Sequence, residues 1–169
     1  MKLNPLKALF VLPMLCCIGY THAQTTQEQA VPKAVTEAFA VKYPKGKFKK
    51  WKADHGNYAG TFNMEGETYA VVYDQNGKWV NTSSKIKWTW KLPAAVKNGL
   101  KNSKYATWDV NGIKKIESSA GLVYELWVDD SNLQRDAFHD SVFTKNILVD
   151  FNPDGKIGKE KDVSGKTLF

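Results

Sequence analysis

Few side chains of this 169-residue chain could carry acid–base or nucleophilic chemistry. Of its three histidines, His22 lies in an N-terminal segment that we expect to be removed, which leaves His55 and His139. His139-Asp140-Ser141 contains the three residue types of a catalytic triad, but consecutive residues of an extended chain point to alternating faces and cannot form one. His55 falls within a predicted turn, which favours a solvated side chain over a ligand.

Metal and thiol chemistry have no better support. The only cysteines are Cys16 and Cys17 in the first apolar run, so the remaining chain has no disulfide, cysteine-ligated zinc or thiol nucleophile. The turns Asp74-Gln75-Asn76-Gly77 and Asn152-Pro153-Asp154-Gly155 resemble the opening of a calcium loop, but neither has the glutamate that would close the coordination shell. We therefore predict no catalytic residue, no metal site, no cofactor and no enzyme activity. A hydrolase that uses Asp129 and Asp130 stays open as an alternative.

The six tryptophans point more clearly to a contact surface. Three of them, Trp51, Trp79 and Trp127, fall in expected strands, where packing of the ring against a helix is the favoured interpretation. The candidates for a contact surface lie nearer the middle of the chain, where Trp88 and Trp90 are two residues apart among lysines. Rigid aromatic rings supply much of the energy at interfaces, although core packing stays open for both residues. The candidate binding residues are Trp88, Trp90, Trp108, Lys87 and Lys91.

The N-terminus indicates export. Lys2 and Lys7 precede an apolar run that is too short to span a bilayer, and Thr21-His22-Ala23 provides small residues before a cleavage point. We predict a signal peptide over 1–23, cleaved after Ala23, no membrane span afterwards, and a periplasmic or secreted protein.

Loss of the two signal lysines lowers the formal charge from +7 to +5. Scattered lysines that keep a secreted surface soluble, and attraction to an anionic partner, are both open explanations of this charge. Arg135 is the only arginine, which together with export counts against nucleic-acid recognition.

Two segments 61 residues apart start in the same way. Val31-Pro32-Lys33-Ala34-Val35 opens a helical apolar pattern that ends before Tyr43-Pro44, and Leu92-Pro93-Ala94-Ala95-Val96 repeats this start. Proline suits the first turn of a helix because its missing N–H would have no partner there.

Strand-like segments follow each predicted helix. We expect strands over 47–53, 58–62, 68–73 and 78–80, and then over 107–110, 113–117, 122–128 and 146–151. Asn76-Gly77 between apolar runs is a strong hairpin signal, and Asp154-Gly155 echoes it 78 residues later. The difference between the offsets of 61 and 78 means that the second half gains 17 residues net between its helix and its final turn. We expect the insert at 129–143, with Arg135 and His139 in it.

The pattern as a whole predicts an α+β fold made of two tandem copies of a helix followed by about four antiparallel strands. The sheets of the two copies would join side by side with the helices on one face. The predicted divisions are a polar leader over 24–30, a first repeat over 31–91, a second over 92–162 and a tail over 163–169. Alternation of Ile86, Trp88, Trp90 and Leu92 with polar residues predicts a strand that bridges the copies.

The doubled helix start and the two closing hairpins together resemble the PepSY-like family of exported Bacteroidetes proteins. This resemblance covers almost all of residues 30–160 and implies a fold like that of the β-lactamase inhibitor protein, with one sheet face partly open. It carries over no catalytic residues.

We therefore expect an exported, non-enzymatic binding module that docks a protein or peptide of the envelope or the extracellular space on its open sheet face. Inhibition of that partner is one mode open to it. The alternative is a carrier of a small ligand or glycan, with Trp88, Trp90 and Trp108 lining a cleft. The identity of the partner and the oligomeric state stay open.

Overall fold

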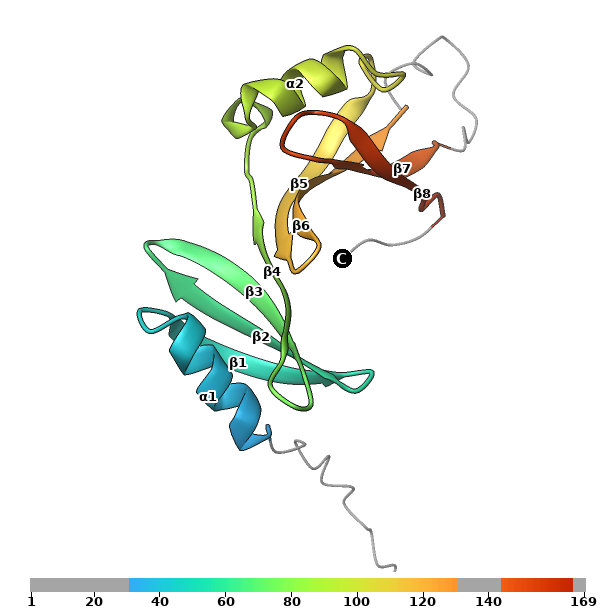
Figure 1. The fold of residues 1–169 in the computed structure, drawn as a ribbon. Helices are drawn as coiled ribbons and strands as arrows, with labels where there is room; N and C mark the ends of the chain where they lie inside the picture. The colour runs from blue at the N-terminus through green and yellow to red at the C-terminus, as the bar shows by residue number, and fades with distance from the viewer. Residues whose placement is uncertain (1–30, 131–143, 166–169) are drawn as a thin grey trace, which may run out of the picture.

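The computed structural model describes residues 31–130 and 144–165 (Figure 1). The predicted signal peptide, the leader, and most of the insert with Arg135 and His139 lie outside the described residues. In chain order the described elements are α1 (Lys33–Lys42), β1 (Lys47–Asp54), β2 (Asn57–Met64), β3 (Glu67–Asp74), β4 (Trp79–Lys85), the 3-10 helix η1 (Thr89–Lys91), α2 (Ala94–Lys101), β5 (Asp109–Ser118), β6 (Gly121–Asp129), β7 (Asn146–Phe151) and β8 (Ile157–Asp162).

All eight strands form one antiparallel sheet in the order of the sequence, so β1 and β8 are its edges. The fold is therefore α+β, as predicted. One correction concerns β5, which runs through the two separate strands expected over 107–110 and 113–117. Its pairing with β6 shifts register between Val110 and Gly112, so Asn111 is the extra residue of a β-bulge. A bulge absorbs one residue without ending the ladder, which is why the strand continues.

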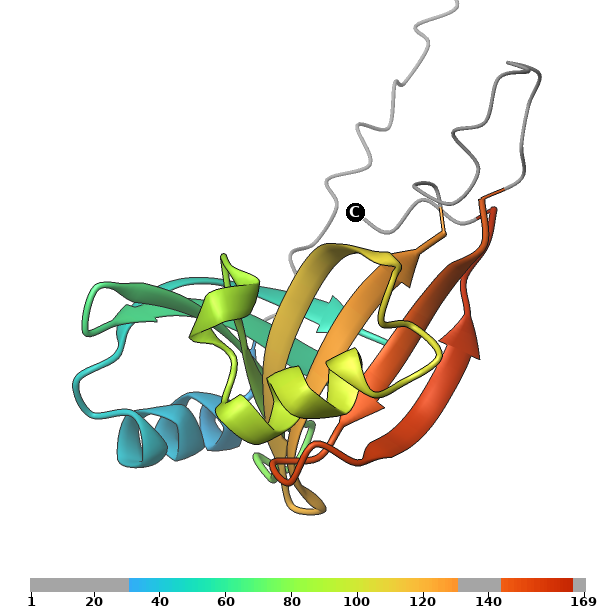
Figure 2. The same ribbon diagram turned by 90° about the horizontal axis from the view of Figure 1, so that it is seen from above.

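Both helices cover the same face of the sheet, as Figure 2 shows from above. Directly paired residues share a face, and the pairs can be followed across the middle of the sheet from Val71 to Thr82 to Glu117. Val71 belongs to the core under α1, and Glu117 shares its face of β5 with Ile113, which belongs to the core under α2. The opposite face has no helix against it in the described part of the chain.

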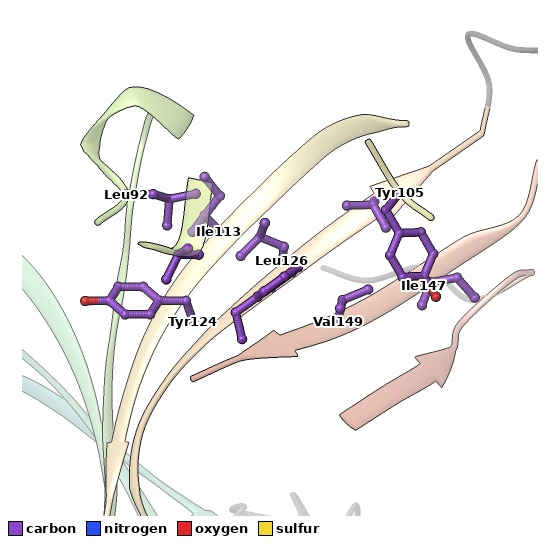
Figure 3. Close-up of a cluster of buried hydrophobic side chains, with 10 residues drawn as sticks. Leu92, Tyr105, Ile113, Tyr124, Leu126, Ile147 and Val149 are labelled. Carbon is purple, nitrogen blue, oxygen red and sulfur yellow. The ribbon is translucent and has the colours of Figure 1, made fainter. Parts of the chain in front are cut away.

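Each helix has its own hydrophobic core. Val35 and Phe39 of α1 pack on Phe62, Val71 and Tyr73. Val96 of α2 packs on a second cluster, whose residues lie together on one side of β5, β6 and β7 in Figure 3. A fully buried side chain of this size contributes roughly 1.5–3 kcal/mol to folding. On the helix side of the sheet, polar residues of the β4–β5 ladder separate the two cores, so the sheet is continuous while the cores are not.

The segment between the halves differs from its prediction. β4 ends at Lys85, and the chain then leaves the sheet, forms η1 and enters α2. Leu92 is 3% exposed beneath α2, whereas Trp88 is 50% and Trp90 66% exposed. The predicted alternation therefore does not form a strand, because burial of Leu92 with the second core draws the chain away from β5.

Two hairpins pack against the starts of the two helices. The Asp74 carboxylate accepts hydrogen bonds from the backbone N–H of Asn76 and Lys78, and the Asn152 side chain accepts the corresponding pair in the β7–β8 turn. Gly77 and Gly155 have φ of 79° and 80°, the region that favours glycine. A Cβ on Gly77 would lie 2.5 Å from the carbonyl oxygen of Ala34, and one on Gly155 would lie 2.1 Å from that of Ala95.

Candidate binding groove

A groove of about 680 Å³ opens on the helix-free face, where the chain crosses from β4 towards α2. Its floor comes from the first half of β5 and from the neighbouring parts of β6 and β7. Its wall is the segment that follows β4. The lining residues are Lys85, Ile86, Lys87, Trp88, Thr89, Val110, Asn111, Gly112, Ile113, Lys114, Glu125, Trp127 and Leu148.

The floor is open because β5 has no side chain at its centre. Gly112 is paired with Trp127, which is in turn paired with Leu148 on β7. A Cβ added at Gly112 would lie 3.7 Å from the Trp127 ring, an ordinary contact distance, so the indole lies beside the empty position. The Trp127 ring is held in place by a hydrogen bond of 2.9 Å from Nε1 to the Asn146 side chain.

Trp127 corrects a prediction. The sequence pattern favours packing of this ring against a helix, but its neighbours Leu126 and Val128 occupy the helix side of β6, so Trp127 points to the opposite face. Trp51 and Trp79 do pack against the first core, as predicted. A partly buried Trp127 beside a glycine offers an aromatic surface to a ligand.

Trp88 forms the wall. The segment that carries it is tied to β5 by a hydrogen bond of 2.9 Å from the Ile86 N–H to the Ile113 carbonyl oxygen. The Lys87 ammonium lies 5.2 Å from the centre of the Trp88 ring, within the range of a cation–π contact. Half of the Trp88 side chain is accessible, so the groove has one aromatic residue on its floor and a second on its wall.

The groove is bordered mainly by positive charge. Three lysines, Lys85, Lys87 and Lys114, line it together with a single carboxylate, Glu125. Glu125 lies 3.5 Å from the Lys114 ammonium, and Lys85 is paired with Lys114 across the β4–β5 ladder. Like charges in paired positions repel each other, so Glu125 offsets part of the repulsion between the strands. The remaining excess favours an anionic group on the ligand.

Asp150 lies beside Glu125 on the same face, as its paired residue on β7. Burial raises the pKa of the Asp150 carboxyl above its usual value, the negative charge of Glu125 raises it further, and Lys159 lowers it. The charged form of Asp150 is therefore disfavoured in the folded protein relative to the unfolded chain.

We expect Asp150→Asn to be more stable than the wild type at neutral pH and equal to it in acid. Because the folded protein holds this proton more tightly than the unfolded chain, wild-type stability falls as pH rises from 3.8 through the raised folded pKa. The amide carries no such penalty, so its advantage grows over the same range. Urea denaturation at a series of pH values measures this difference. The advantage should shrink in a Glu125→Gln background, and a difference that does not vary with pH would show that ionisation of Asp150 is not its cause.

The structure separates the five predicted binding residues. Lys87 and Trp88 line the groove. Trp90 is exposed with the Lys91 ammonium 5.7 Å from its ring centre, and neither residue contributes to the lining. Trp108 packs edge-on to Tyr105 beside the second core. Sequence reasoning missed Gly112 and Trp127, although a glycine inside a strand is itself a signal of a bulge or a close approach.

The candidate catalytic residues occupy other places. His55 is almost fully exposed in the β1–β2 turn, with Nδ1 2.6 Å from the Asp54 carboxylate. Asp129 accepts a hydrogen bond from the Asn111 side chain, and Asp130 accepts one from the Lys145 N–H at 2.8 Å. His139-Asp140-Ser141 lies outside the described residues. Over residues 31–130 and 144–165, no three histidine, cysteine or acidic side chains gather in a potential metal cluster.

No family model and no curated protein matches the sequence. Solved structures do. A BLIP-like protein from Bacteroides fragilis superposes with a TM-score of 0.72 at 21% identity, over 85% of this chain and 94% of its own. A DUF2874 family protein from Bacteroides ovatus gives 0.68 at 26% identity, over 80% and 90%. A protein provisionally named as periplasmic, from Bacteroides eggerthii, gives 0.68 at 19% identity, over 82% and 94%.

None of the described helices is long and apolar enough to cross a membrane. The similarity to these structures extends over four fifths or more of the chain. The α+β fold of this chain, with its eight-stranded antiparallel sheet, therefore superposes on structures that include a BLIP-like protein. The chain has a BLIP-like fold.

Proposed function

We propose that the chain is an exported, non-enzymatic binding module that docks a protein or peptide partner on the helix-free face of its sheet. The observation that carries the proposal is the groove on that face, with Trp88 on its wall and Trp127 on its floor. Accessible tryptophans in a concave site are typical anchors of binding energy at interfaces. The lysines around the groove would direct an anionic partner to it.

Inhibition of the partner is one mode of this docking. It is supported by the BLIP-like name of the Bacteroides fragilis protein, which describes that protein and shares only the fold with this chain. Export to the periplasm or beyond is supported by the N-terminal sequence and by the provisional name of the Bacteroides eggerthii protein.

The two halves are also proposed to be tandem copies of one PepSY-like unit. The support is their common layout, with a helix that starts at a proline and is followed by four strands. In both halves a glycine of the last hairpin contacts the second residue after that proline, which is Ala34 in one half and Ala95 in the other.

The test begins with a partner captured from the cell envelope by a photo-reactive amino acid at Thr89, which lines the groove. The same amino acid at Lys101, on α2 and away from the groove, is the matched control. The proposal expects a discrete cross-linked product from Thr89 that is absent from Lys101.

With that partner in hand, Trp88→Ala should weaken binding by about tenfold or more, because it removes an anchor of the site. Gly112→Leu should weaken binding comparably by filling the floor, since no positive φ restricts this position. Trp90→Ala is the matched control, because Trp90 is more exposed than Trp88 and lies outside the groove. Calorimetric titration measures all three affinities. Equal losses for Trp88→Ala and Trp90→Ala would show that the partner contacts the exposed segment that carries both tryptophans, and not the groove.

A small-ligand or glycan carrier is the second candidate, favoured by the volume of the groove. Sites for small molecules usually enclose about 300–1,000 Å³ and are lined by aromatic side chains with a few polar groups. Titration of tryptophan fluorescence with acidic sugars would detect this activity, because both groove tryptophans would respond. A response that Gly112→Leu abolishes favours the carrier, and no response to any of the sugars counts against it.

A further inference from the structure

The strongest concentration of charge in the described chain lies on β1, at an edge of the sheet and away from the groove. Residues 42–52 contain six lysines and no acidic residue, and four of the lysines belong to β1. All four are exposed. Among the described residues, no carboxylate forms an ion pair with Lys47, Lys50 or Lys52.

A β-bulge aligns these three lysines on one face. Lys47 is paired with Asn63, Lys50 with Thr61 and Lys52 with Ala59, which are alternate residues of β2. The spacing from Lys47 to Lys50 would place their side chains on opposite faces of a regular strand. The register shift between Phe48 and Lys50 adds one residue to β1, which brings the Lys50 side chain to the same face as Lys47. The three lysines therefore follow one another at every second ladder position, with a backbone spacing of roughly 7 Å.

The other face of β1 is apolar along the same edge. Phe48 and Trp51 are paired with Phe62 and Gly60 on the side of α1, and their rings stack with centroids 5.2 Å apart. Phe48 is nevertheless 43% exposed, because no strand lies beyond β1 in the described part of the chain. The edge therefore presents lysines on one side of the sheet and an uncovered aromatic ring on the other.

We propose that the free edge of β1 accepts an extended segment of a partner protein, in which acidic and apolar side chains alternate, as an additional strand of the sheet. A strand has the same two-residue period as the three lysines, so acidic residues at alternate positions would each face one of them. The intervening apolar residues would cover Phe48. Backbone hydrogen bonds to the open edge supply affinity in this mode of recognition, and the alternating side chains supply specificity.

The charge of β1 also decides against pairing of this edge with the β1 edge of a second copy of this chain. Two β1 strands paired edge to edge would bring lysines opposite lysines, which is destabilising. Lysines on an edge strand commonly prevent aggregation, because they disfavour pairing with another strand. A strand with acidic side chains would neutralise them and could still pair. The opposite edge differs, since β8 carries Glu160 between Lys159 and Lys161.

The test uses a peptide of alternating glutamate and valine with blocked ends, eight residues long to match β1, added to the ¹⁵N-labelled protein. We expect shifts of backbone amide resonances centred on β1 and the adjoining β2. The same peptide N-methylated along its whole length keeps every charge and loses every backbone donor, so it should bind at least tenfold more weakly. Shifts centred elsewhere, or no binding, would overturn the proposal.

Charge reversal locates the site. The triple variant Lys47→Glu, Lys50→Glu, Lys52→Glu should weaken peptide binding at least tenfold. The variant Lys156→Glu, Lys159→Glu, Lys161→Glu makes the same change in net charge at the β8 edge and should change binding less than twofold. Replacement of the β1 lysines by glutamine is a milder variant that should weaken binding in the same direction. Equal effects of the two reversals, or unimpaired binding of the methylated peptide, would reduce the interaction to general charge attraction and overturn the proposed strand pairing.

The proposal for the β1 edge and the proposal for the groove can be tested independently. The β1 edge belongs to the first half of the chain and shares no residue with the lining of the groove. Loss of peptide binding in the β1 variants therefore says nothing against the groove, and Trp88→Ala should leave binding of the peptide unchanged.

Discussion

Phe62→Ala should lower the free energy of unfolding by about 3–5 kcal/mol, which is the usual cost of removing a buried aromatic ring. Phe62 is completely buried and lies 5.1 Å from Phe39 of α1 and 4.7 Å from Tyr43, measured between ring centroids. The ring therefore joins α1 to the centre of β2, and alanine would leave a cavity that the rigid sheet cannot close. Urea denaturation followed by circular dichroism measures the loss.

Phe48→Ala is the matched control for this substitution. Phe48 is paired with Phe62 on the same face of the sheet, but it is 43% exposed. Its removal takes less surface out of the core and leaves no enclosed cavity, so we expect a loss of about 1 kcal/mol. If both variants lost the same stability, the core under α1 would not be the source of the Phe62 effect.

Gly155→Ala is the second substitution with a large expected effect, a loss of about 2–5 kcal/mol. About 1–2 kcal/mol comes from placing a side chain at a φ of 80°. A further loss of about 1–3 kcal/mol comes from overpacking. The new Cβ would lie 2.1 Å from the Ala95 carbonyl oxygen, which belongs to the backbone of α2 and cannot rotate away. Thermal and urea denaturation should both show the effect.

Gly56 provides a control for the loss that comes from overpacking. Gly56 has the same φ of 80°, but no atom lies within 4 Å of a Cβ placed on it. Gly56→Ala should therefore lose only the conformational term, about 1–2 kcal/mol. A loss in Gly155→Ala no greater than that in Gly56→Ala would show that the β7–β8 hairpin does not pack against α2.

The groove and the β1 edge share one feature, which is the direction of their lysines. Lys47, Lys50 and Lys52 point away from the helices, as does Lys114 in the groove. Acidic groups at either place would meet positive charge on the helix-free side of the sheet. Increasing salt should weaken binding of the acidic peptide at the β1 edge, because salt screens exposed charges most effectively. Binding of a partner in the groove should weaken less, since part of it comes from the partly buried Trp127 ring.

Local sequence determined the elements of this fold. Pro32 and Pro93 precede the two helices because proline suits a helix start, and the glycines of the closing hairpins occupy positions with positive φ. The boundaries of β1, β2 and β3 follow from alternation and turn residues within two positions, whereas β4, expected over 78–80, continues to Lys85. These signals depend on neighbouring residues only, so they can be evaluated without knowledge of the folded chain.

Tertiary structure decided the candidate site. The alternation of Ile86, Trp88, Trp90 and Leu92 suits a strand equally well, and only the burial of Leu92 under α2 takes the chain off the sheet and leaves Trp88 exposed. The face on which Trp127 lies follows from the register of β6 against the bulged β5, which no local pattern specifies. The groove requires Gly112, Trp127 and Trp88 to meet from three separate segments. Sequence alone could therefore nominate Trp88, but the concave site around it arises from contacts between residues far apart in the chain.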